Sequence, residues 1–591
     1  MPLKRSEVNE KLKWKMTDIF SSQEEFDKLF EEVSGKIGFG KYEGKLSDEK
    51  VLLNCLRELD EVETSLEKLD VYAYMLKDLD TRDSSAAALL AKVENLLVSY
   101  SSAVSFITPE LTSLPEEKLQ AIIADPAFSD YDYMLKCLLK DKPHVLSKEC
   151  ENLLALGGQV FGGYHDIFSM INNADMPFPE IEIDGKKVTV SHGMYGVLLQ
   201  SDNREVREKA FKAYYKAFIS LINTISATYI GSVNTDVYMA RARKYESCLQ
   251  KALSQEDVDP VVYRNLLESV ESGLPVLHRY VADRKKVLGV DELHMYDIYT
   301  PLVENTDIKM PYEDAFALVK KGLAPLGEEY GRLLQKAHDE GWIDVEETEG
   351  KRSGAYSICV YGMPHPYVLL NYQQTSHDVF TIAHELGHAM HSYHSDQNQP
   401  KSKANYKIFV AEVASTVNEV LLLKYLLKNS DDVKLKKYLC SYYMDMIRTT
   451  LFRQTMFAEF EYISHDAAEK GIPLTKDYLN EQYLGLNRKY YGEDIVSDEE
   501  IAYEWARIPH FYTSFYVYKY ATGIISAISI AERIYQEGKP AVDDYFRFLS
   551  SGGSDDPVRL LKLAGVDLTK KDAFNAAMRS FEETLAQFES L

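Results

Sequence analysis

Apolar residues recur at three- and four-residue spacings along most of the chain, and charged residues fill the positions between them. This period matches an α-helix with one buried face. It predicts long amphipathic helices over residues 23–37, 47–69, 84–104 and 202–240. Packing between antiparallel helical hairpins is sufficient to explain such segments. The chain is therefore expected to be mainly α-helical.

Period-two alternation, the mark of a β-strand, is rare. Residues 180–190 alternate around Asp184 and Gly185, which predicts a β-hairpin with a two-residue turn. The Pro-containing run 176–179 just before it breaks the helical pattern. We interpret this run as a junction between an N-terminal helical part and the rest of the chain, and a hinge near it is a hypothesis.

A second extended stretch, residues 353–372, contains Gly362 and two prolines that argue against helix. Residues 367–372 are predicted either as an edge strand, whose free backbone groups could pair with a peptide, or as an ordinary strand inside a sheet. Gly362, Tyr367 and Asn371 are accordingly candidate substrate contacts.

Composition and charge limit the partners of this helical chain. Its 591 residues exceed one compact core, so two or three domains or one elongated helical body are expected. The net charge of −25 at pH 7 argues against nucleic acid or an anionic membrane as partner. No signal peptide and no apolar run long enough to span a bilayer is visible. Six cysteines without a CxxC pair are typical of a reduced, cytoplasmic protein.

The helix predicted to start at a capping box of Thr375 and Asp378 carries an HExxH motif. His384 and His388 are four residues apart, so both imidazoles project from one face and can bind one metal ion. Glu385 lies about a hundred degrees round the helix, where it can take a proton from an attacking water. Imidazole with carboxylate suits Zn²⁺, and an open coordination position indicates catalysis. A chance occurrence is the alternative, so the third ligand matters.

Two residues compete to be that third ligand. His394 stands ten residues after His384, as in the HExxHxxGxxH metalloproteases, where the Gly lets the chain turn away. Here that position is His391, so the helix should continue and carry His394 away from the metal; His391 itself is a candidate for supporting the ligands. Glu412 and Glu419 lie on one face of a second apolar helix, where buried acids need a partner. We predict that Glu412 binds the metal and that Glu419 orients a ligand imidazole, unless Glu419 is a solvated helix charge.

The residues at 384–391 (HELGHAMH) and 409–419 (FVAEVASTVNE) resemble the oligoendopeptidase F group of the M3 metallopeptidases, relatives of thimet oligopeptidase and neurolysin. The resemblance covers most of the chain. Further matching segments are KWKMTDIF at 13–20, EIDGKKVTVSHGMYGVLL at 182–199, YDIYTPL at 296–302, RIPHFYTSFYVYKYATG at 507–523 and SSGGSDDPVRLLKLAGVDL at 550–568.

This resemblance implies a mainly α fold: a large two-lobed helical body enclosing a deep substrate channel, with a small β-sheet next to the zinc-binding helix. It implies N-terminal helical hairpins over residues 1–110, an oligoendopeptidase F N-terminal-type segment with the β-hairpin over 111–195, and an M3-type catalytic domain over 196–591. It also implies one Zn²⁺ per chain, with the Glu of the second helix as third ligand.

In the family, C-terminal His and Tyr residues donate hydrogen bonds to the substrate and to the oxyanion. The matching positions are His510 and Tyr518, with Tyr512 and Tyr516 as further candidates. A neutral donor at a developing oxyanion is worth roughly 3 kcal/mol, and Tyr stays protonated at neutral pH. We expect Tyr520, in the same aromatic run, to pack in the core.

The function predicted from all these residues is that of a cytoplasmic zinc metalloendopeptidase. It would hydrolyse internal bonds of short unfolded peptides, with Glu385 as general base. A catalytically idle peptide-binding protein on the same fold is the alternative, and a metallohydrolase acting on another amide is a third hypothesis. Oligomeric state is not predicted.

Overall fold

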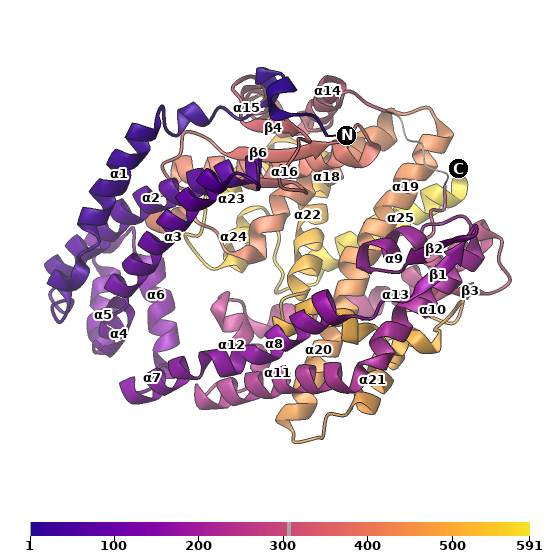
Figure 1. Ribbon diagram of the computed structural model, residues 1–591, viewed down its shortest axis with the longest axis horizontal. Coiled ribbons are helices and arrows are strands. Elements are labelled where there is room, and N and C mark those ends of the chain that lie inside the picture. The colour runs from indigo at the N-terminus through magenta and orange to yellow at the C-terminus, as the bar shows by residue number, and fades with distance from the viewer. Residues whose placement is uncertain (1, 304–308) are drawn as a thin grey trace. The chain divides into compact units, whose positions relative to one another are not determined.

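The structure is a computed structural model that describes residues 2–303 and 309–591. It is mainly helical with a few small sheets, as the sequence predicted (Figure 1). The chain forms two compact units, and in the described residues unit 1 comprises 2–143, 309–428 and 526–566. Unit 2 comprises 144–303, 429–525 and 567–591. The domain boundaries and the channel expected from the sequence stay predictions.

Unit 1 contains both chain segments that carry the predicted metal ligands. Its helices, whole or for most of their length, are α1 (Gln23–Lys36), α2 (Glu49–Leu79), α3 (Ser84–Val104), α4 (Ile107–Ser113), α5 (Glu116–Ala124), α6 (Asp132–Asp141), α14 (Tyr312–Gly322), α15 (Gly327–Asp339), α16 (Ser376–Asn398), α17 (Lys401–Ala404), α18 (Ile408–Asn429), α23 (Lys539–Leu549) and α24 (Pro557–Leu563). A short 3-10 helix, η9 (Ala324–Leu326), joins α14 to α15.

Unit 2 contains the predicted hairpin and the aromatic C-terminal segment. Its helices are α7 (Lys148–Leu156), α8 (Gly158–Met170), α9 (His192–Leu198), α10 (Arg204–Ser220), α11 (Ile222–Ala242), α12 (Cys248–Gln255), α13 (Pro260–Leu288), α19 (Val433–Ile447), α20 (Arg453–Glu469), α21 (Lys476–Tyr491) and α25 (Asp572–Ser590), with the short 3-10 helices η11 (Glu499–Arg507) and η12 (Pro509–Tyr512). The helix α22 (Tyr518–Glu537) is divided between the units at Ser526. No helix in the described ranges is long and apolar enough to cross a membrane.

The predicted hairpin is confirmed as β1 (Glu180–Ile183) paired antiparallel with β2 (Lys186–Thr189). Its turn residues Asp184 and Gly185 both have positive φ, 52° and 75°, as a two-residue turn of this kind requires. The single helix predicted over 202–240 is wrong in one respect, because it breaks between α10 and α11 at Leu221. A two-residue parallel pair, β3 (Leu293–His294) with β7 (Ile495–Val496), completes the strands of unit 2.

The small sheet of unit 1 packs against α16, which confirms the predicted sheet next to that helix. Its strand order is β4 (Ile343–Glu346), β6 (Tyr367–Tyr372), β5 (Tyr356–Ile358). The strand β6 lies between the other two: it pairs parallel with β4 and, through Tyr367–Leu369, antiparallel with β5. The edge-strand hypothesis for residues 367–372 is therefore wrong, and the ordinary interior strand is correct.

The start of α16 is set by the predicted capping box. The hydroxyl of Thr375 accepts the backbone N–H of Asp378 at 3.2 Å, and the carboxylate of Asp378 accepts the backbone N–H of Thr375 at 2.8 Å. The helix then runs unbroken to Asn398, past the position where a Gly would have allowed a turn. Because the helix continues, it carries His394 away from His384 and His388, as predicted.

The two helices that carry the predicted ligands, α16 and α18, approach closely at Gly387. A Cβ atom placed on Gly387 would lie 2.5 Å from Ser415 Cα and 2.6 Å from the Ala414 carbonyl oxygen. Nearby, the side chain of Asn418 donates to the Ala383 carbonyl at 2.9 Å, which ties α18 to the backbone of α16. The absence of a side chain at Gly387 thus permits this helix–helix distance.

We expect Gly387→Ala to separate the two helices, because the atoms that a methyl group would meet belong to the backbone. Overpacking of this kind costs about 1–3 kcal/mol. Displacing Glu412 from the histidines should also weaken metal binding about tenfold. Thermal unfolding and zinc titration of the purified variant measure the two effects.

The matched control is Gly331→Ala on α15, because a Cβ there meets only Lys320 Cε at an ordinary 3.9 Å. This variant should bind zinc like the wild type and be no less stable, since Ala is the better helix former. If Gly387→Ala matched Gly331→Ala in both measurements, the close approach would not set the ligand geometry.

Candidate active site

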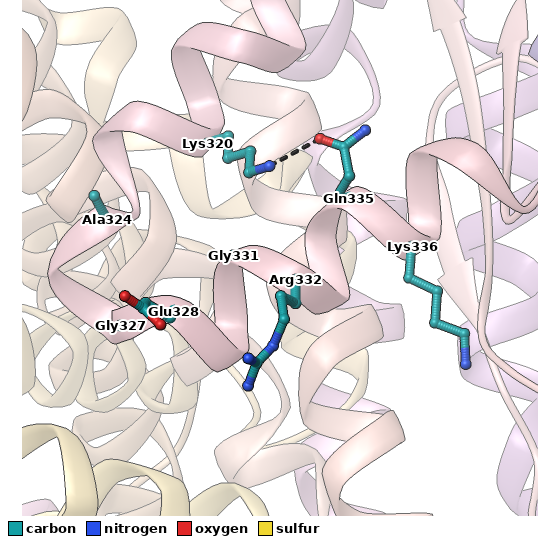
Figure 2. Close-up of a pocket in the computed structure, with 8 residues that line it drawn as sticks. All are labelled: Lys320, Ala324, Gly327, Glu328, Gly331, Arg332, Gln335 and Lys336. Atoms are coloured by element: carbon teal, nitrogen blue, oxygen red, sulfur yellow. Dashed lines mark hydrogen bonds between the residues drawn. The ribbon is translucent and has the colours of Figure 1, made fainter.

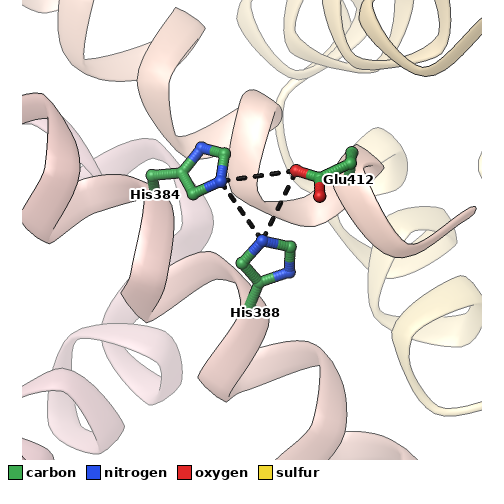
Figure 3. A group of neighbouring side chains, drawn as sticks. All are labelled: His384, His388 and Glu412. Atoms are coloured by element: carbon green, nitrogen blue, oxygen red, sulfur yellow. Dashed lines mark hydrogen bonds and ion pairs between the residues drawn. The ribbon is translucent and has the colours of Figure 1, made fainter. Parts of the chain in front are cut away.

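Three predicted ligand atoms converge in unit 1 (Figure 3). The Nε2 atoms of His384 and His388, from adjacent turns of α16, lie 3.2 Å apart. One carboxylate oxygen of Glu412, from α18, lies 3.3 Å from His384 Nε2 and 3.5 Å from His388 Nε2. The three atoms form a nearly equilateral triangle.

The size of this triangle fits a tetrahedral zinc site. Bonds of 2.0–2.1 Å at tetrahedral angles place ligand atoms about 3.3 Å apart. The donor set of two imidazoles and one carboxylate is that of catalytic zinc sites, in which the fourth position stays open. Within residues 2–303 and 309–591, no other group of three His, Cys, Asp or Glu side chains gathers in this way.

A second carboxylate, that of Glu419, contacts the ring nitrogen of His384 that is not part of the triangle. The Nδ1 atom of His384 lies 2.6 Å from a carboxylate oxygen of Glu419, one heptad after Glu412 on α18. Because Nδ1 donates to Glu419, Nε2 of the neutral imidazole is left with its lone pair toward the triangle. The Ser415 hydroxyl donates to the Glu412 backbone carbonyl at 2.9 Å and lies 3.3 Å from a Glu412 carboxylate oxygen.

The electrostatics of the group follow from packing two acids against two imidazoles. Burial acts to lower the pKa of His384, but hydrogen bonds to Glu412 and Glu419 outweigh it and raise this pKa to about 10. Burial acts to raise the pKa of Glu412, and the hydrogen bonds and charge of the two imidazoles bring it well below its usual value. Both pKa shifts favour a positive charge beside the Glu412 carboxylate. A bound cation would supply that charge in place of a proton.

Glu385 lies next to the triangle without joining it. Its side chain is buried, with 7% of the residue exposed, and burial raises the pKa of its carboxyl. The positive charges of His384 and His388 act in the opposite direction, so the carboxyl lies in the field of both imidazoles. A carboxylate in this place can accept a proton from a group at the open position.

The two histidines beyond the motif do not reach the triangle. His391 is fully buried and stacks on Tyr406 with ring centroids 3.7 Å apart, and burial lowers its pKa to about 3. Among the described residues, neither of its ring nitrogens has a hydrogen-bond partner, so it supports the helix by packing rather than by orienting a ligand. His394 is buried against Phe546 instead. Neither residue belongs to the ligand group.

The predicted substrate contacts of the extended stretch have different surroundings. Tyr367 is fully buried in the middle strand, packed against Trp14, so its proposed contact with substrate does not fit its burial. Asn371 donates to the carbonyls of Arg352 and Gly354 at 2.9 and 2.8 Å. Gly362 occupies a turn with φ of 82°.

Asn371 also lines a cavity of about 300 Å³ beside the first turns of α16. The cavity is bounded by residues of the loop before β5, the end of β6 and the start of α16. These residues are Gly354, Ala355, Leu370, Asn371, Tyr372, His377, Asp378 and Thr381.

The candidates of the C-terminal segment lie in unit 2 and divide into two kinds. Tyr518 has only 1% of its surface exposed and packs on Tyr263, with ring centroids 5.2 Å apart. Tyr512 stacks on Phe168 at 4.3 Å, and its hydroxyl lies 2.7 Å from that of Thr228. Both tyrosines are therefore engaged inside unit 2.

By contrast, His510, Tyr516 and Tyr520 form an accessible group. The hydroxyl of Tyr520 lies 3.4 Å from His510 Nε2, and the ring of Tyr516 lies 6.0 Å from that of His510 and 5.5 Å from that of Tyr520. The expectation that Tyr520 packs in the core is wrong, because Tyr520 is only half-buried. No sequence signal paired Tyr516 with Tyr520, because Tyr516 precedes α22 and helical spacing therefore does not relate the two residues.

A larger hollow of about 680 Å³ lies on unit 1 at the turn between α14 and α15 (Figure 2). Lys320 reaches across it to donate to Gln335 at 2.8 Å, and Arg332 and Lys336 point outward from α15. It shares no residue with the ligand triangle, and size alone does not make it the site of chemistry. The triangle is the better candidate.

Comparisons with known proteins agree on one family. The sequence model of peptidase family M3 matches residues 197–580, and that of oligopeptidase F matches residues 110–178. The chain is 45% identical to oligopeptidase PepF of Bacillus subtilis over 99% of its own length and 88% of that protein. It is also 39% identical to the group B oligopeptidase PepB of Streptococcus agalactiae, over 99% of its own length and 98% of that protein.

A solved structure supports the same assignment. The crystal structure of oligoendopeptidase-F from Enterococcus faecium is similar with a TM-score of 0.73 and 35% identity, covering 96% of this chain and 98% of the other. The family match extends over more than half of the chain and includes α16 and α18 with their ligand triangle. The chain therefore belongs to peptidase family M3 and, within it, to the oligoendopeptidase F group of metallopeptidases.

Proposed function

We propose that this protein is a zinc-dependent endopeptidase that cuts internal bonds of short peptides. The observation that carries the proposal is the triangle of His384, His388 and Glu412, whose edges of 3.2–3.5 Å suit a tetrahedral zinc ion, with buried Glu385 beside it. The names of the relatives, oligopeptidase and oligoendopeptidase, favour short peptides as substrates. A cytoplasmic location and one zinc ion per chain are part of the proposal.

The three ligands would hold the metal, which when bound supplies Lewis-acid chemistry for the scissile carbonyl and the attacking water. Glu385 accepts the proton of that water and delivers it to the leaving amine. Glu419 keeps His384 in the tautomer whose Nε2 faces the triangle.

The sheet beside α16 offers a place for the peptide backbone. Since β6 is paired on both sides, the strand with an available edge next to it is β5. A peptide that extends the sheet at Tyr356–Ile358 would be recognised through its main chain, which suits an enzyme with many substrates. The cavity lined by Gly354 and Ala355, just before β5, would take a neighbouring side chain.

We assign the hydrogen-bond donors of the C-terminal segment to His510, Tyr516 and Tyr520. The resemblance pointed to His510 and Tyr518, but the burial of Tyr518 and the contact of Tyr520 with His510 favour Tyr520. A phenol hydroxyl near an imidazole can donate to a developing oxyanion while it stays neutral.

A catalytically idle peptide-binding protein is the second candidate. It would keep the fold and lose a ligand or the base, whereas here the three ligand atoms converge and the sequence retains Glu385 beside His384. A metallohydrolase for another amide is less well supported, because the names of the relatives concern peptides. Hydrolysis of a quenched fluorogenic peptide, with and without a zinc chelator, distinguishes these functions.

Glu385→Gln should bind zinc with wild-type stoichiometry and hydrolyse that peptide about 100- to 10,000-fold more slowly, because the amide cannot accept the proton. Metal analysis and steady-state kinetics on the same preparation measure both. Near wild-type turnover would refute the assignment of the base. Loss of zinc together with turnover would show instead that Glu385 contributes to binding the metal.

Tyr520→Phe should lower kcat about 100-fold and change KM little, because the donor acts on charge that develops only in the transition state. Tyr518→Phe is the matched control, since it removes a hydroxyl buried in unit 2 and should keep kcat near the wild-type value. The opposite order of effects would return the role to Tyr518.

A further inference from the structure

The segment that joins η12 to α22 contains one residue in an unfavourable backbone conformation. Phe515 has φ of 58°, in the left-handed region that non-glycine residues rarely adopt. Its ring is 3% exposed and lies 4.7 Å from the ring of His465, centroid to centroid. Such strain persists only where the surrounding structure holds it in place.

The left-handed turn coincides with the grouping of the outer side chains. Tyr516 follows it directly, and its ring faces that of His510 with an interplanar angle of 20°. Tyr520, one helical turn further, contacts both rings. A residue with an ordinary extended or helical φ at 515 would send Tyr516 in another direction, so the group depends on this turn.

A buried carboxyl holds the turn from inside unit 2. The backbone N–H of Phe515 donates to Glu461 Oε1, on α20, at 2.9 Å. Glu461 is fully buried, and in the part of the chain that the structure describes its second oxygen, Oε2, has no hydrogen-bond partner. Burial raises the pKa of Glu461 well above its usual value, while the hydrogen bond from the Phe515 N–H acts in the opposite direction.

A second acid holds the preceding residue. The hydroxyl of Ser514 donates to Asp236 Oδ2, on α11, at 2.5 Å. The same oxygen lies 3.4 Å from His465 Nε2, while His465 Nδ1 contacts the carbonyl oxygen of Glu461 at 2.8 Å. Burial acts to raise the pKa of Asp236, but hydrogen bonds from His465 and Ser514 lower it below its usual value. A charged acceptor makes the bond to Ser514 strong.

Asp236 and Glu461 have no part in the metal chemistry proposed above. The buried carboxyl of Glu461, whose Oε2 has no hydrogen-bond partner among the described residues, therefore needs another explanation. The helices α11 and α20 pack on each other within unit 2, so the two acceptors present a fixed pair of sites to one chain segment (Figure 1). Tyr512, bonded to Thr228 on α11, adds a third attachment two residues earlier. Tyr512, Ser514 and Phe515 thus anchor the segment inside unit 2. The side chains of His510, Tyr516 and Tyr520 form the accessible group.

We propose that Glu461 is a positioning residue for His510, Tyr516 and Tyr520: by accepting the N–H of Phe515, its carboxyl holds the left-handed turn that brings these side chains together. This inference rests on the proposed function for the catalytic value of the group. The holding of the turn itself does not depend on that function.

The test uses two variants of similar volume in the full-length zinc enzyme. Glu461→Gln keeps a neutral acceptor for the Phe515 N–H, whereas Glu461→Met fills the space without one. Hydrogen exchange of residues 510–517, measured without peptide, should rise about tenfold in Glu461→Met and stay near wild type in Glu461→Gln. In the same pair, kcat should fall about tenfold or more only in the Met variant, with KM within about threefold of wild type.

Thr455→Val is the control for removing a buried polar group from α20, because the Thr455 hydroxyl donates to the carbonyl of Leu451, four residues earlier in the chain, and not to the segment that contains Phe515. It should change neither measurement. Wild-type exchange or wild-type kcat in Glu461→Met, or equal defects in the Met and Gln variants, would overturn the proposal. If Glu461→Met does not fold, Glu461→Leu, which is smaller and likewise offers no acceptor for the Phe515 N–H, takes its place, and unchanged exchange there has the same meaning.

The two proposals fail in different ways. If the wild-type enzyme does not hydrolyse peptides, the proposed function is lost, and the exchange measurement still decides whether Glu461 holds the turn. If the enzyme is active and Tyr520→Phe is impaired while Glu461→Met is normal, only the positioning role is lost.

Discussion

The contact between α16 and α18 at Gly387 is the constraint on which the candidate site depends. HExxH supplies two imidazoles from one helix, but a third ligand must come from elsewhere in the chain, here 24 residues after His388. That ligand reaches the histidines because the backbones of the two helices nearly touch. The hydrogen bond from Asn418 to α16 and the capping box at Thr375 then fix the rotation and the start of the helices.

Partly burying four ionisable side chains in this contact is tolerated because their charges compensate. Two carboxylates of α18 face two imidazoles of α16, and each carboxylate has a separate partner atom. An isolated buried acid would be costly, and the same acids paired with imidazoles or with a cation are not. In unit 2 a different solution appears, in which hydrogen bonds lower the pKa of Asp236 below its usual value and burial raises that of Glu461.

The sequence was most informative where the chemistry is local. Helical spacing predicted the common face of His384 and His388, and the replacement of a turn-forming Gly by His391 predicted that the helix would continue. Sequence could not show that β6 is an interior strand, because strand order depends on pairings between distant segments. Sequence also could not show that Tyr518 is buried and Tyr520 only half-buried, because the left-handed turn at Phe515 changes which side chains face outward, and no residue type signals that turn.

Because Gly387 cannot carry a side chain, the motif of this chain is more specific than the pattern HExxH states. A pattern written HExxH treats both x positions as free, yet here Leu386 is 1% exposed in the core and Gly387 admits no Cβ. A search with HELGH and a distant small residue opposite the Gly would discard most chance matches in Glu-rich helices. The residues that confer no chemistry are thus the ones that make the pattern diagnostic.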